Sequence, residues 1–402
     1  SRVHFSRNGA GGRGLWQRLC PSVFASPLMS EEIDRHVLRR YEIVQKLGRG
    51  AYGIVWKALN KKKQESCALK KCFDAFQNAT DAQRTFREIM FLKELDGHPN
   101  IVQIQKVLRA DNGLDVYVVF NYMETDLHAV IRANILEEVH KQFVIYQLLC
   151  ALKYIHSGQL IHRDLKPSNV LLNSDCSVRL CDFGLARSLD TQNSPQNKPA
   201  APILTDYVAT RWYRAPEILL GSHRYSEGVD TWSVGCILGE MAMGKPIFPG
   251  SSTLDQLDRI IGAIGRPTQK DIDSVQSSFA ASMLENLKHS RGRSLKDLLY
   301  KAKPEAKGLM QMCLQFSPGQ RPSAKQCIQH PYILDFHIPR EEPEYGGTVR
   351  IPLDDNTKLS VDVYRERIYS ELEKKSSKKK RSSNDQAGKT SPSPWMLPPG
   401  KP

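Results

Sequence analysis

Alternating hydrophobic and polar positions near the start of the chain predict a β-sheet. Over five short stretches the side chains alternate with the two-residue period of a strand, and turn residues separate the stretches. Between the third and fourth stretch, residues 80–95 show a helical period behind a Thr-Asp start. The pattern predicts five antiparallel strands and one helix, ending near residue 123. The predicted strands are 41–48 (YEIVQKLG), 53–60 (GIVWKALN), 66–72 (SCALKKC), 101–108 (IVQIQKVL) and 115–122 (DVYVVFNY).

Beyond residue 123 the pattern becomes mainly helical. Residues 137–156 have a broad apolar face at helical spacing and predict one long helix. Residues 188–203 are polar and contain proline, which is typical of a loop. A strand-rich first part followed by a helical second part predicts an α+β fold. Shorter helices are predicted at 228–243, 253–264, 294–300, 304–315 and 323–329.

Composition places the chain among soluble globular proteins. Of its 402 residues, 40% are hydrophobic and 25% are charged, and no apolar run is long enough to cross a membrane. The length allows two or three domain-sized units or one large two-lobed unit. Nine scattered cysteines predict a reduced, intracellular protein, because a disulfide scaffold would need a shorter chain with regularly spaced cysteines.

The net charge of +14 suggests a nucleic-acid binder until its position is considered. Residues 1–28 contain four arginines and no acidic residue, 374–381 (KKSSKKKR) contain six cations, and 382–402 add a net +1. The body, 29–373, therefore carries only +3. A nucleic-acid-binding surface on the body is therefore not expected. The first 28 residues resemble a transit peptide in composition, but Met29 opens a native-looking start, which favours upstream or foreign sequence before it.

A glycine-rich turn provides the first chemical motif. Gly48, Gly50 and Gly53 follow the pattern G-x-G-x-x-G-x-V, which also occurs in dinucleotide-binding turns. Here the glycines join two strands instead of a strand and a helix, so we expect their backbone N–H groups to cover phosphates. Lys70 on the next strand and Glu88 on the following helix are predicted to form an ion pair that holds the ammonium group toward those phosphates.

Two further motifs are more specific because they occur together and in order. In His-Arg-Asp-Leu-Lys-Pro-Ser-Asn (162–169), Asp164 can accept a hydroxyl proton and Lys166 can neutralise a transferred phosphoryl group. Asn169 and Asp182, the latter in Asp-Phe-Gly, offer the hard oxygen ligands that Mg²⁺ prefers. Ala-Pro-Glu at 215–217 closes the series.

With these motifs, residues 36–336 resemble the eukaryotic protein kinases. The resemblance implies a two-lobed α+β fold, in which a small lobe of five antiparallel strands and one helix precedes a large, mainly helical lobe. It also implies that Arg321 pairs with Glu217. The expected division is an N-terminal extension (1–35), a small lobe (36–123), a large lobe (124–340) with its activation loop (182–217), an extension packing back on the kinase (341–373) and a disordered basic tail (374–402).

The resemblance also implies an ATP site with Mg²⁺. Phe120 would be the gatekeeper, the backbone of Met123 would bind adenine, and Asp126 would reach the ribose. Cys181, directly before Asp182, is either a thiol facing the phosphates or, as we favour, an inert half-buried one. The residues expected to bind the nucleotide are Leu47, Gly48, Gly50, Gly53, Val55, Ala68, Lys70, Phe120, Met123, Asp126, Asn169, Leu171 and Asp182.

The stretch 204–217 (LTDYVATRWYRAPE) resembles the mitogen-activated protein kinases, which carry Thr-x-Tyr at this place. Phosphates on Thr205 and Tyr207 would each add about −1.5 to −2 charges and would need guanidinium partners. The resemblance implies that phospho-Thr205 would order the loop against Arg84, Arg87, Arg163 and Arg187, and that phospho-Tyr207 would bind Arg211 and Arg214.

Other stretches, among them FDAFQNATDAQRTFREI, are similar to the atypical extracellular signal-regulated kinases of this family. The resemblance implies a proline-directed serine/threonine kinase, a monomer acting on protein Ser/Thr-Pro sites in cytoplasm and nucleus. Either an upstream kinase or the enzyme itself would phosphorylate Thr205 and Tyr207, and phosphatases would reverse this. Membranes and specific nucleic acids are not expected partners. Alternatives are a cyclin-dependent-like kinase and a pseudokinase scaffold. Ser194, Ser391 and Ser393, each before proline, are either self-phosphorylation sites or features of disordered segments.

Overall fold

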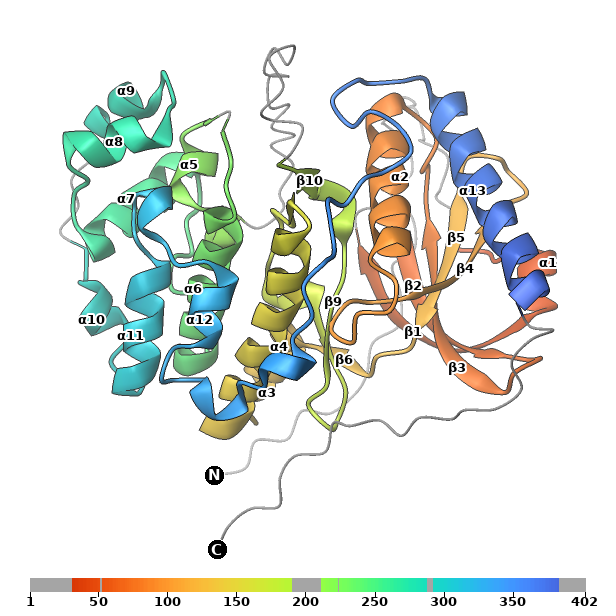
Figure 1. Cartoon of the computed structure of the whole chain (residues 1–402), viewed down its shortest axis with the longest axis horizontal. Coiled ribbons are helices and arrows are strands. Elements are labelled where there is room, and N and C mark those ends of the chain that lie inside the picture. Colours follow the sequence, from red (N-terminus) through yellow and green to blue (C-terminus); the bar gives the residue numbers. More distant parts are fainter. Residues whose placement is uncertain (1–30, 51–52, 190–210, 223, 288–291, 383–402) are drawn as a thin grey trace, which may run out of the picture. The chain divides into compact units, whose positions relative to one another are not determined.

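The computed structural model describes residues 31–50, 53–189, 211–222, 224–287 and 292–382, with side chains as far as Glu371. The helices and strands given below all belong to one compact unit that begins at Asp34. Figure 1 shows a β-sheet in the first part of this unit and helices in the second, which confirms the predicted two-lobed α+β fold.

The small lobe is built on a five-stranded antiparallel sheet of order β1-β2-β3-β5-β4. One long helix, α2, packs in this lobe and begins where Asn78 caps it, its side chain accepting from the backbone N–H groups of Thr80 and Asp81 at 2.9 and 3.0 Å. The elements are α1 (Arg35–Leu38), β1 (Tyr41–Gly50), β2 (Gly53–Asn60), β3 (Glu65–Cys72), α2 (Ala79–Glu94), β4 (Ile104–Arg109) and β5 (Val116–Asn121).

Strand β4 starts later than the hydrophobic pattern predicts. Ile101 forms an isolated parallel bridge with Leu180, and the Val102 N–H donates to the Leu180 carbonyl oxygen at 2.9 Å. The apolar residues that precede β4 therefore pair with a strand that follows the catalytic motif, and not with the sheet. Their backbone ties the two lobes together.

The large lobe surrounds helix α4, most of whose second half is buried. The predicted helices are present, but several are shorter than expected. Small antiparallel sheets connect them, ordered β6-β8-β9 and β10-β7. The elements are β6 (Thr125–Asp126), α3 (Leu127–Ala133), α4 (Glu138–Ser157), β7 (Leu160–Ile161), β8 (Val170–Leu172), β9 (Val178–Leu180), β10 (Arg187–Ser188), α5 (Pro216–Leu219), α6 (Gly228–Met243), α7 (Thr253–Ile264), α8 (Gln269–Val275), α9 (Ala280–Glu285), α10 (Leu295–Leu298), α11 (Pro304–Cys313) and α12 (Ala324–Ile328).

After the large lobe the chain returns to the small lobe and ends in helix α13 (Val361–Ser382), which lies beside α2 in Figure 1. The rings of Phe86 and Tyr364 are 5.4 Å apart between centroids, and the Lys93 ammonium donates to Glu371 at 2.9 Å. The last part of the predicted extension thus forms a helix that packs on α2. It continues past residue 373, where the sequence predicts the basic tail to begin.

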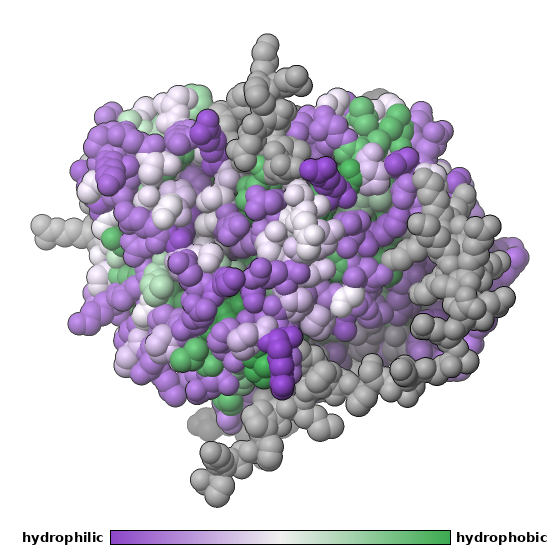
Figure 2. All heavy atoms as spheres, viewed as in Figure 1, coloured by the Kyte–Doolittle hydropathy of each residue, from purple (hydrophilic) through white to green (hydrophobic). Residues whose placement is uncertain are grey.

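On the face shown in Figure 2, hydrophilic side chains dominate among the described residues, and hydrophobic ones gather in small separate patches. In the described part of the chain, no helix combines the length and the hydropathy that crossing a bilayer requires. This agrees with the absence of a long apolar run in the sequence.

Candidate active site

The sheet register places several of the predicted nucleotide-binding residues on one face. Val55 lies opposite Lys70, and Ala68 lies opposite Phe120. Because cross-strand partners share a face and residues two apart return to it, these four side chains line the same side of the sheet. Gly48 lies opposite Val55 on the neighbouring strand.

Gly53 is required by a close approach of two strands. A Cβ atom at this position would lie 2.1 Å from the carbonyl oxygen of Lys71, well inside contact distance. At Gly48, by contrast, no described atom lies within 4 Å of an added Cβ. The glycine-rich turn therefore serves two purposes: Gly53 lets β2 approach β3, and Gly48 leaves the surface open. Ala51 and Tyr52 lie outside the described residues.

The predicted ion pair between Lys70 and Glu88 is present. The Lys70 ammonium donates to Glu88 Oε1 at 2.6 Å, and the two side chains are 22% and 12% exposed. Burial on its own would lower the pKa of Lys70, but the carboxylates of Glu88 and Asp182 outweigh burial and raise it. The lysine is therefore held as a cation on β3, the central strand of the sheet.

The catalytic motif forms a compact hydrogen-bonded loop. Lys166 Nζ donates to Asp164 Oδ2 at 2.6 Å, and the Asn169 amide donates to the Asp164 carbonyl oxygen at 2.8 Å. A 3-10 turn, Pro167–Asn169, brings Asn169 back toward Asp164. The Asp164 carboxylate is 9% exposed. The three predicted residues thus lie together, with a cation and an amide against one carboxylate.

Asp230, near the start of α6, accepts hydrogen bonds from the backbone of this loop. Its two carboxylate oxygens accept the backbone N–H groups of His162 and Arg163, both at 2.8 Å, and His156 contacts it at 2.9 Å. Arg163 has a left-handed backbone, φ 67°, which is costly for a residue with a side chain. The hydrogen bonds that Asp230 accepts from this backbone stabilise that conformation. The sequence analysis predicted the helix that contains Asp230 but not this role.

Asp182 lies at the same end of the β8–β9 hairpin as Asn169. The Cys181 N–H donates to the Asn169 carbonyl oxygen at 3.0 Å, which joins the residue before β8 to the one after β9. Burial raises the pKa of Asp182, but the cations Arg84, Lys70 and Lys166 outweigh it and lower the pKa to about 2. An ionised carboxylate and an amide at one hairpin end are a donor set that suits Mg²⁺.

Cys181 fits the inert alternative. Burial raises the pKa of its thiol well above the usual range, with the Asp182 carboxylate adding to the effect. A thiol that stays protonated is a poor nucleophile. The eight cysteines among the described residues are free.

The remaining predicted nucleotide-binding residues come from several elements, Leu47 from β1, Asp126 from β6 and Leu171 from β8. Met123 is buried and Leu47 is partly exposed. Leu171 pairs with Asp126 between β8 and β6. Asp126 also caps α3, with its Oδ1 accepting from the Ala129 N–H at 2.9 Å. Sequence reasoning missed this cap because it did not predict α3.

The six arginines predicted to bind phosphate have different contact partners in the structure. Arg84 Nη2 lies 3.5 Å from Asp182 Oδ2, and Arg163 stacks on Tyr225 at 4.5 Å. Arg211 donates to the Ser251 carbonyl oxygen at 3.0 Å, and the Arg214 N–H donates to the Arg211 carbonyl oxygen at 3.1 Å. Arg87 and Arg187 both contact Asp355, a residue that sequence reasoning did not single out. Thr205 and Tyr207 lie outside the described residues.

The predicted pair between Arg321 and Glu217 is present and bidentate. Arg321 Nη1 and Nη2 donate to the two Glu217 carboxylate oxygens at 2.6 and 2.8 Å. The two side chains are fully buried. This contact fixes the end of the Ala-Pro-Glu motif to the core of the large lobe.

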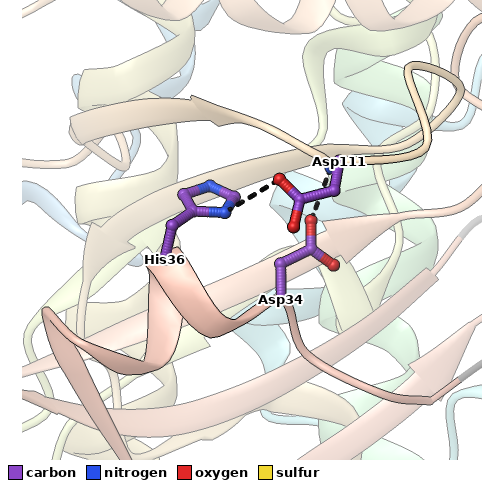
Figure 3. Close-up of side chains that lie close together, drawn as sticks. All are labelled: Asp34, His36 and Asp111. Carbon is purple, nitrogen blue, oxygen red and sulfur yellow. Dashed lines mark hydrogen bonds and ion pairs between the residues drawn. The ribbon is translucent and has the colours of Figure 1, made fainter.

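Another cluster of titratable groups, Asp34, His36 and Asp111, joins α1 to the loop between β4 and β5 (Figure 3). Asp34 Oδ1 accepts from the Tyr117 hydroxyl at 3.0 Å, and Asp34 Oδ2 accepts from the Asp111 N–H at 2.7 Å. His36 Nδ1 lies 3.3 Å from Asp111 Oδ1. Because protein donors already occupy the carboxylate oxygens of Asp34, the cluster fastens α1 to the sheet.

Comparisons with known proteins agree with this geometry. The protein kinase domain family model matches residues 41–333. Extracellular signal-regulated kinase 2 of Dictyostelium discoideum is 55% identical over 91% of this chain and 99% of its own length. Mitogen-activated protein kinase 15 of Xenopus laevis is 53% identical over 84% of this chain, and that of Caenorhabditis elegans is 48% identical over 88%. The match covers 58% and 75% of those two proteins.

Proposed function

The chain belongs to the protein kinases and, within them, to the mitogen-activated protein kinases, and on this basis we propose that it phosphorylates protein Ser or Thr residues that precede Pro. Use of ATP follows from the protein kinase domain. The observation that best supports the detailed proposal is the arrangement of Asp164, Lys166 and Asn169 beside the end of the β8–β9 hairpin that carries Asp182.

In the proposed mechanism each of these residues has one task. Asp164 accepts the proton of the substrate hydroxyl as the hydroxyl oxygen attacks the γ-phosphorus. The bond between that phosphorus and the β–γ bridging oxygen breaks, and ADP leaves. Lys166, 2.6 Å from Asp164, neutralises charge on the phosphoryl group. Lys70, held by Glu88, contacts the α- and β-phosphates, and the backbone at Gly48 and Gly50 covers them.

The ligands proposed for Mg²⁺ are Asn169 and Asp182. Their fit rests on chemistry, because the Asp182 carboxylate stays ionised and Asn169 offers an amide oxygen. Bound Mg²⁺ supplies neutralisation of phosphate charge. Met123, Phe120 and Leu171 would then border the adenine, and Asp126 would reach the ribose.

Activation by phosphorylation of Thr205 and Tyr207 remains a proposal, since both residues lie outside the described part of the chain. It is supported by Arg87 and Arg187, which already converge on an anion. The division into lobes at residue 123, an extension from 341 and a tail from 374 is likewise proposed. Protein substrates follow from the family, whereas an upstream kinase, phosphatases, a monomeric state and residence in cytoplasm and nucleus are proposals.

The alternatives differ in what they need. A cyclin-dependent-like kinase is disfavoured because the relatives compared above are all named as signal-regulated or mitogen-activated kinases. A pseudokinase scaffold would lack one of the four groups Lys70, Asp164, Asn169 and Asp182, and all four are present.

The direct test measures phosphorylation of a Ser-Pro peptide by the wild type and by Asp164→Asn. Loss of the base should lower kcat by about 10²–10⁴-fold, while ATP still binds. A matched peptide with Ala in place of Pro tests the proposed specificity. If Asp164→Asn kept wild-type kcat, the proposed mechanism would be wrong. If the wild type bound ATP and never turned over, the scaffold alternative would hold.

A further inference from the structure

Asp355 contacts two of the arginines, Arg87 and Arg187, that the kinase resemblance predicts to bind phosphate. The residue precedes α13, and its side chain is 6% exposed. Arg87 Nε donates to Asp355 Oδ1, and Arg87 Nη2 donates to the Asp355 carbonyl oxygen at 3.1 Å. Arg187 Nε lies 3.7 Å from Asp355 Oδ2. One residue of the C-terminal extension therefore contacts two arginines from two different elements.

The positions of these arginines connect Asp355 to the active site. Arg87 directly precedes Glu88 on α2, and Glu88 holds Lys70. Arg187 opens β10, shortly after Asp182. Gln83, one turn before Arg87, also donates to the Asp355 carbonyl oxygen, at 3.1 Å. Asp355 thus bridges the helix that orients Lys70 and the strand that follows the predicted metal ligand.

Charge explains why an anion belongs at this place. Burial lowers the pKa of Arg187, and the like charge of Arg87 lowers it further, so the two cations repel each other in a poorly hydrated environment. Arg163 adds to this repulsion. A carboxylate between Arg87 and Arg187 offsets the repulsion and allows both to stay charged.

The carboxylate leaves this site incompletely satisfied. Among the described residues, neither Asp355 Oδ2 nor the buried Arg163 Nε has a hydrogen-bond partner. A carboxylate has two oxygens, whereas a phosphate monoester has three strong acceptor oxygens and a larger charge. A phosphate at the same place would therefore satisfy more of the guanidinium donors than Asp355 does.

We propose that Asp355 is a positioning residue: it supplies the anion that holds Arg87 and Arg187 together before the activation loop is phosphorylated, and it thereby keeps Glu88 against Lys70. A phosphate on Thr205 then takes over this task. The second statement rests on the proposed function, whereas the first depends only on contacts between described residues.

The test compares Asp355→Asn with the wild type in the full chain, unphosphorylated and with phosphothreonine encoded at position 205. Hydrogen–deuterium exchange in α2 and steady-state kinetics are both measured. In the unphosphorylated enzyme, Asp355→Asn should speed exchange in α2 and lower kcat/KM for ATP about tenfold, because a charge-assisted contact is lost. In the phosphorylated enzyme both quantities should stay within about twofold of the wild type.

Two further variants serve as controls. Asp354→Asn removes a neighbouring carboxylate that accepts from Asn356 and Thr357, and it should leave both readouts unchanged. Asp355→Glu keeps the charge and should restore protection and kcat/KM to within about twofold of wild type. This variant also decides the matter if Asp355→Asn does not fold.

The outcomes separate the two proposals. The positioning role would be overturned if Asp355→Asn lowered α2 protection and kcat/KM equally in both phosphorylation states, or lowered neither in the unphosphorylated enzyme. It would also be overturned if Asp355→Glu were as defective as Asp355→Asn. If phosphothreonine at position 205 did not raise the activity of the wild type, the proposed activation by loop phosphorylation would be wrong. Hydrogen–deuterium exchange in α2 of the unphosphorylated chain would still test the role of Asp355.

Discussion

Two ion pairs, one in each lobe, both join a basic side chain to a glutamate, but their basic groups use their hydrogen-bond donors to different extents. Arg321 in the large lobe donates to both Glu217 oxygens and to the carbonyl oxygens of Gln315, Phe316 and Gly228. Lys70 in the small lobe donates one hydrogen bond among the described residues, to Glu88.

The difference separates a structural ion pair from one available for binding. A guanidinium with its donors satisfied and no exposed surface has nothing left to offer a ligand. The Lys70 ammonium has three N–H donors, of which one is used among the described residues, and its side chain is 22% exposed. The composition of an ion pair therefore does not reveal its role, whereas the number of unused donors does.

The largest effect is expected from Lys70→Arg. The substitution keeps a cation beside Glu88, but a planar guanidinium cannot place its charge where the ammonium lies. We expect kcat/KM to fall by about 10²–10³-fold. The free energy of unfolding should stay within about 1 kcal/mol of wild type, because the pair is partly exposed. Peptide phosphorylation and urea unfolding of the same preparation measure both. If the free energy of unfolding fell by as much as the transition-state stabilisation calculated from kcat/KM, Lys70 would have a structural role.

The reciprocal substitution, Arg321→Lys, should show the opposite pattern. An ammonium cannot reach two carboxylate oxygens and three carbonyl oxygens at once, so buried acceptors lose their donors. We expect the free energy of unfolding to fall by about 3 kcal/mol in urea titrations. The activity per folded molecule should stay within about twofold of wild type.

Arg259→Lys is the matched control for that substitution. Arg259 is 46% exposed and pairs with Asp255 one helical turn away. Such surface pairs contribute little, so a change below about 0.5 kcal/mol is expected. Equal losses at positions 259 and 321 would refute the distinction between the exposed pair and the buried pair.

A smaller effect is expected at His98, a buried titratable group without a carboxylate partner. Its Nδ1 accepts the Asn100 N–H at 3.1 Å, and its ring lies 4.5 Å from that of Tyr154. Burial, with Arg179 adding to it, lowers the pKa of His98 to about 4. Below a pH of about 6.5, His98 binds a proton in the unfolded chain but stays neutral in the folded chain. The free energy of unfolding therefore falls as the pH drops from about 6.5 toward 4.

This linkage should cost about 2 kcal/mol between pH 7 and pH 5, measured by urea unfolding at the two pH values. His98→Gln should lack this part of the pH dependence, although it lowers stability at pH 7. His128→Gln, at an exposed position, serves as control and should keep it. The same pH dependence in wild type and His98→Gln would show that other groups cause it.

The sequence predicted the long elements well, because five strands and helices α2, α4, α6 and α7 each span several periods of their pattern. The short helices α8 (Gln269–Val275) and α9 (Ala280–Glu285) were missed, since one or two turns do not establish a helical period. The start of β4 was placed too early because Ile101 and Val102 are apolar for a different reason, their pairing with Leu180.

The site was predictable where its residues lie close together in the chain. Asp164, Lys166 and Asn169 belong to one motif, and local hydrogen bonds bring them together. Asp355 lies 268 residues from Arg87, and no periodicity or motif indicates which carboxylate of the extension faces the arginines. Only the packing of α13 on α2 decides that.

The return of the chain to the small lobe has a practical consequence for anyone who shortens this enzyme. The match to the protein kinase domain ends at residue 333, yet side chains as far as Glu371 anchor the helix that carries Glu88. A polypeptide trimmed at that limit would retain every recognisable motif and lose Asp355, Tyr364 and Glu371. We therefore expect the shortest active polypeptide to extend well beyond residue 333, where the kinase domain match ends.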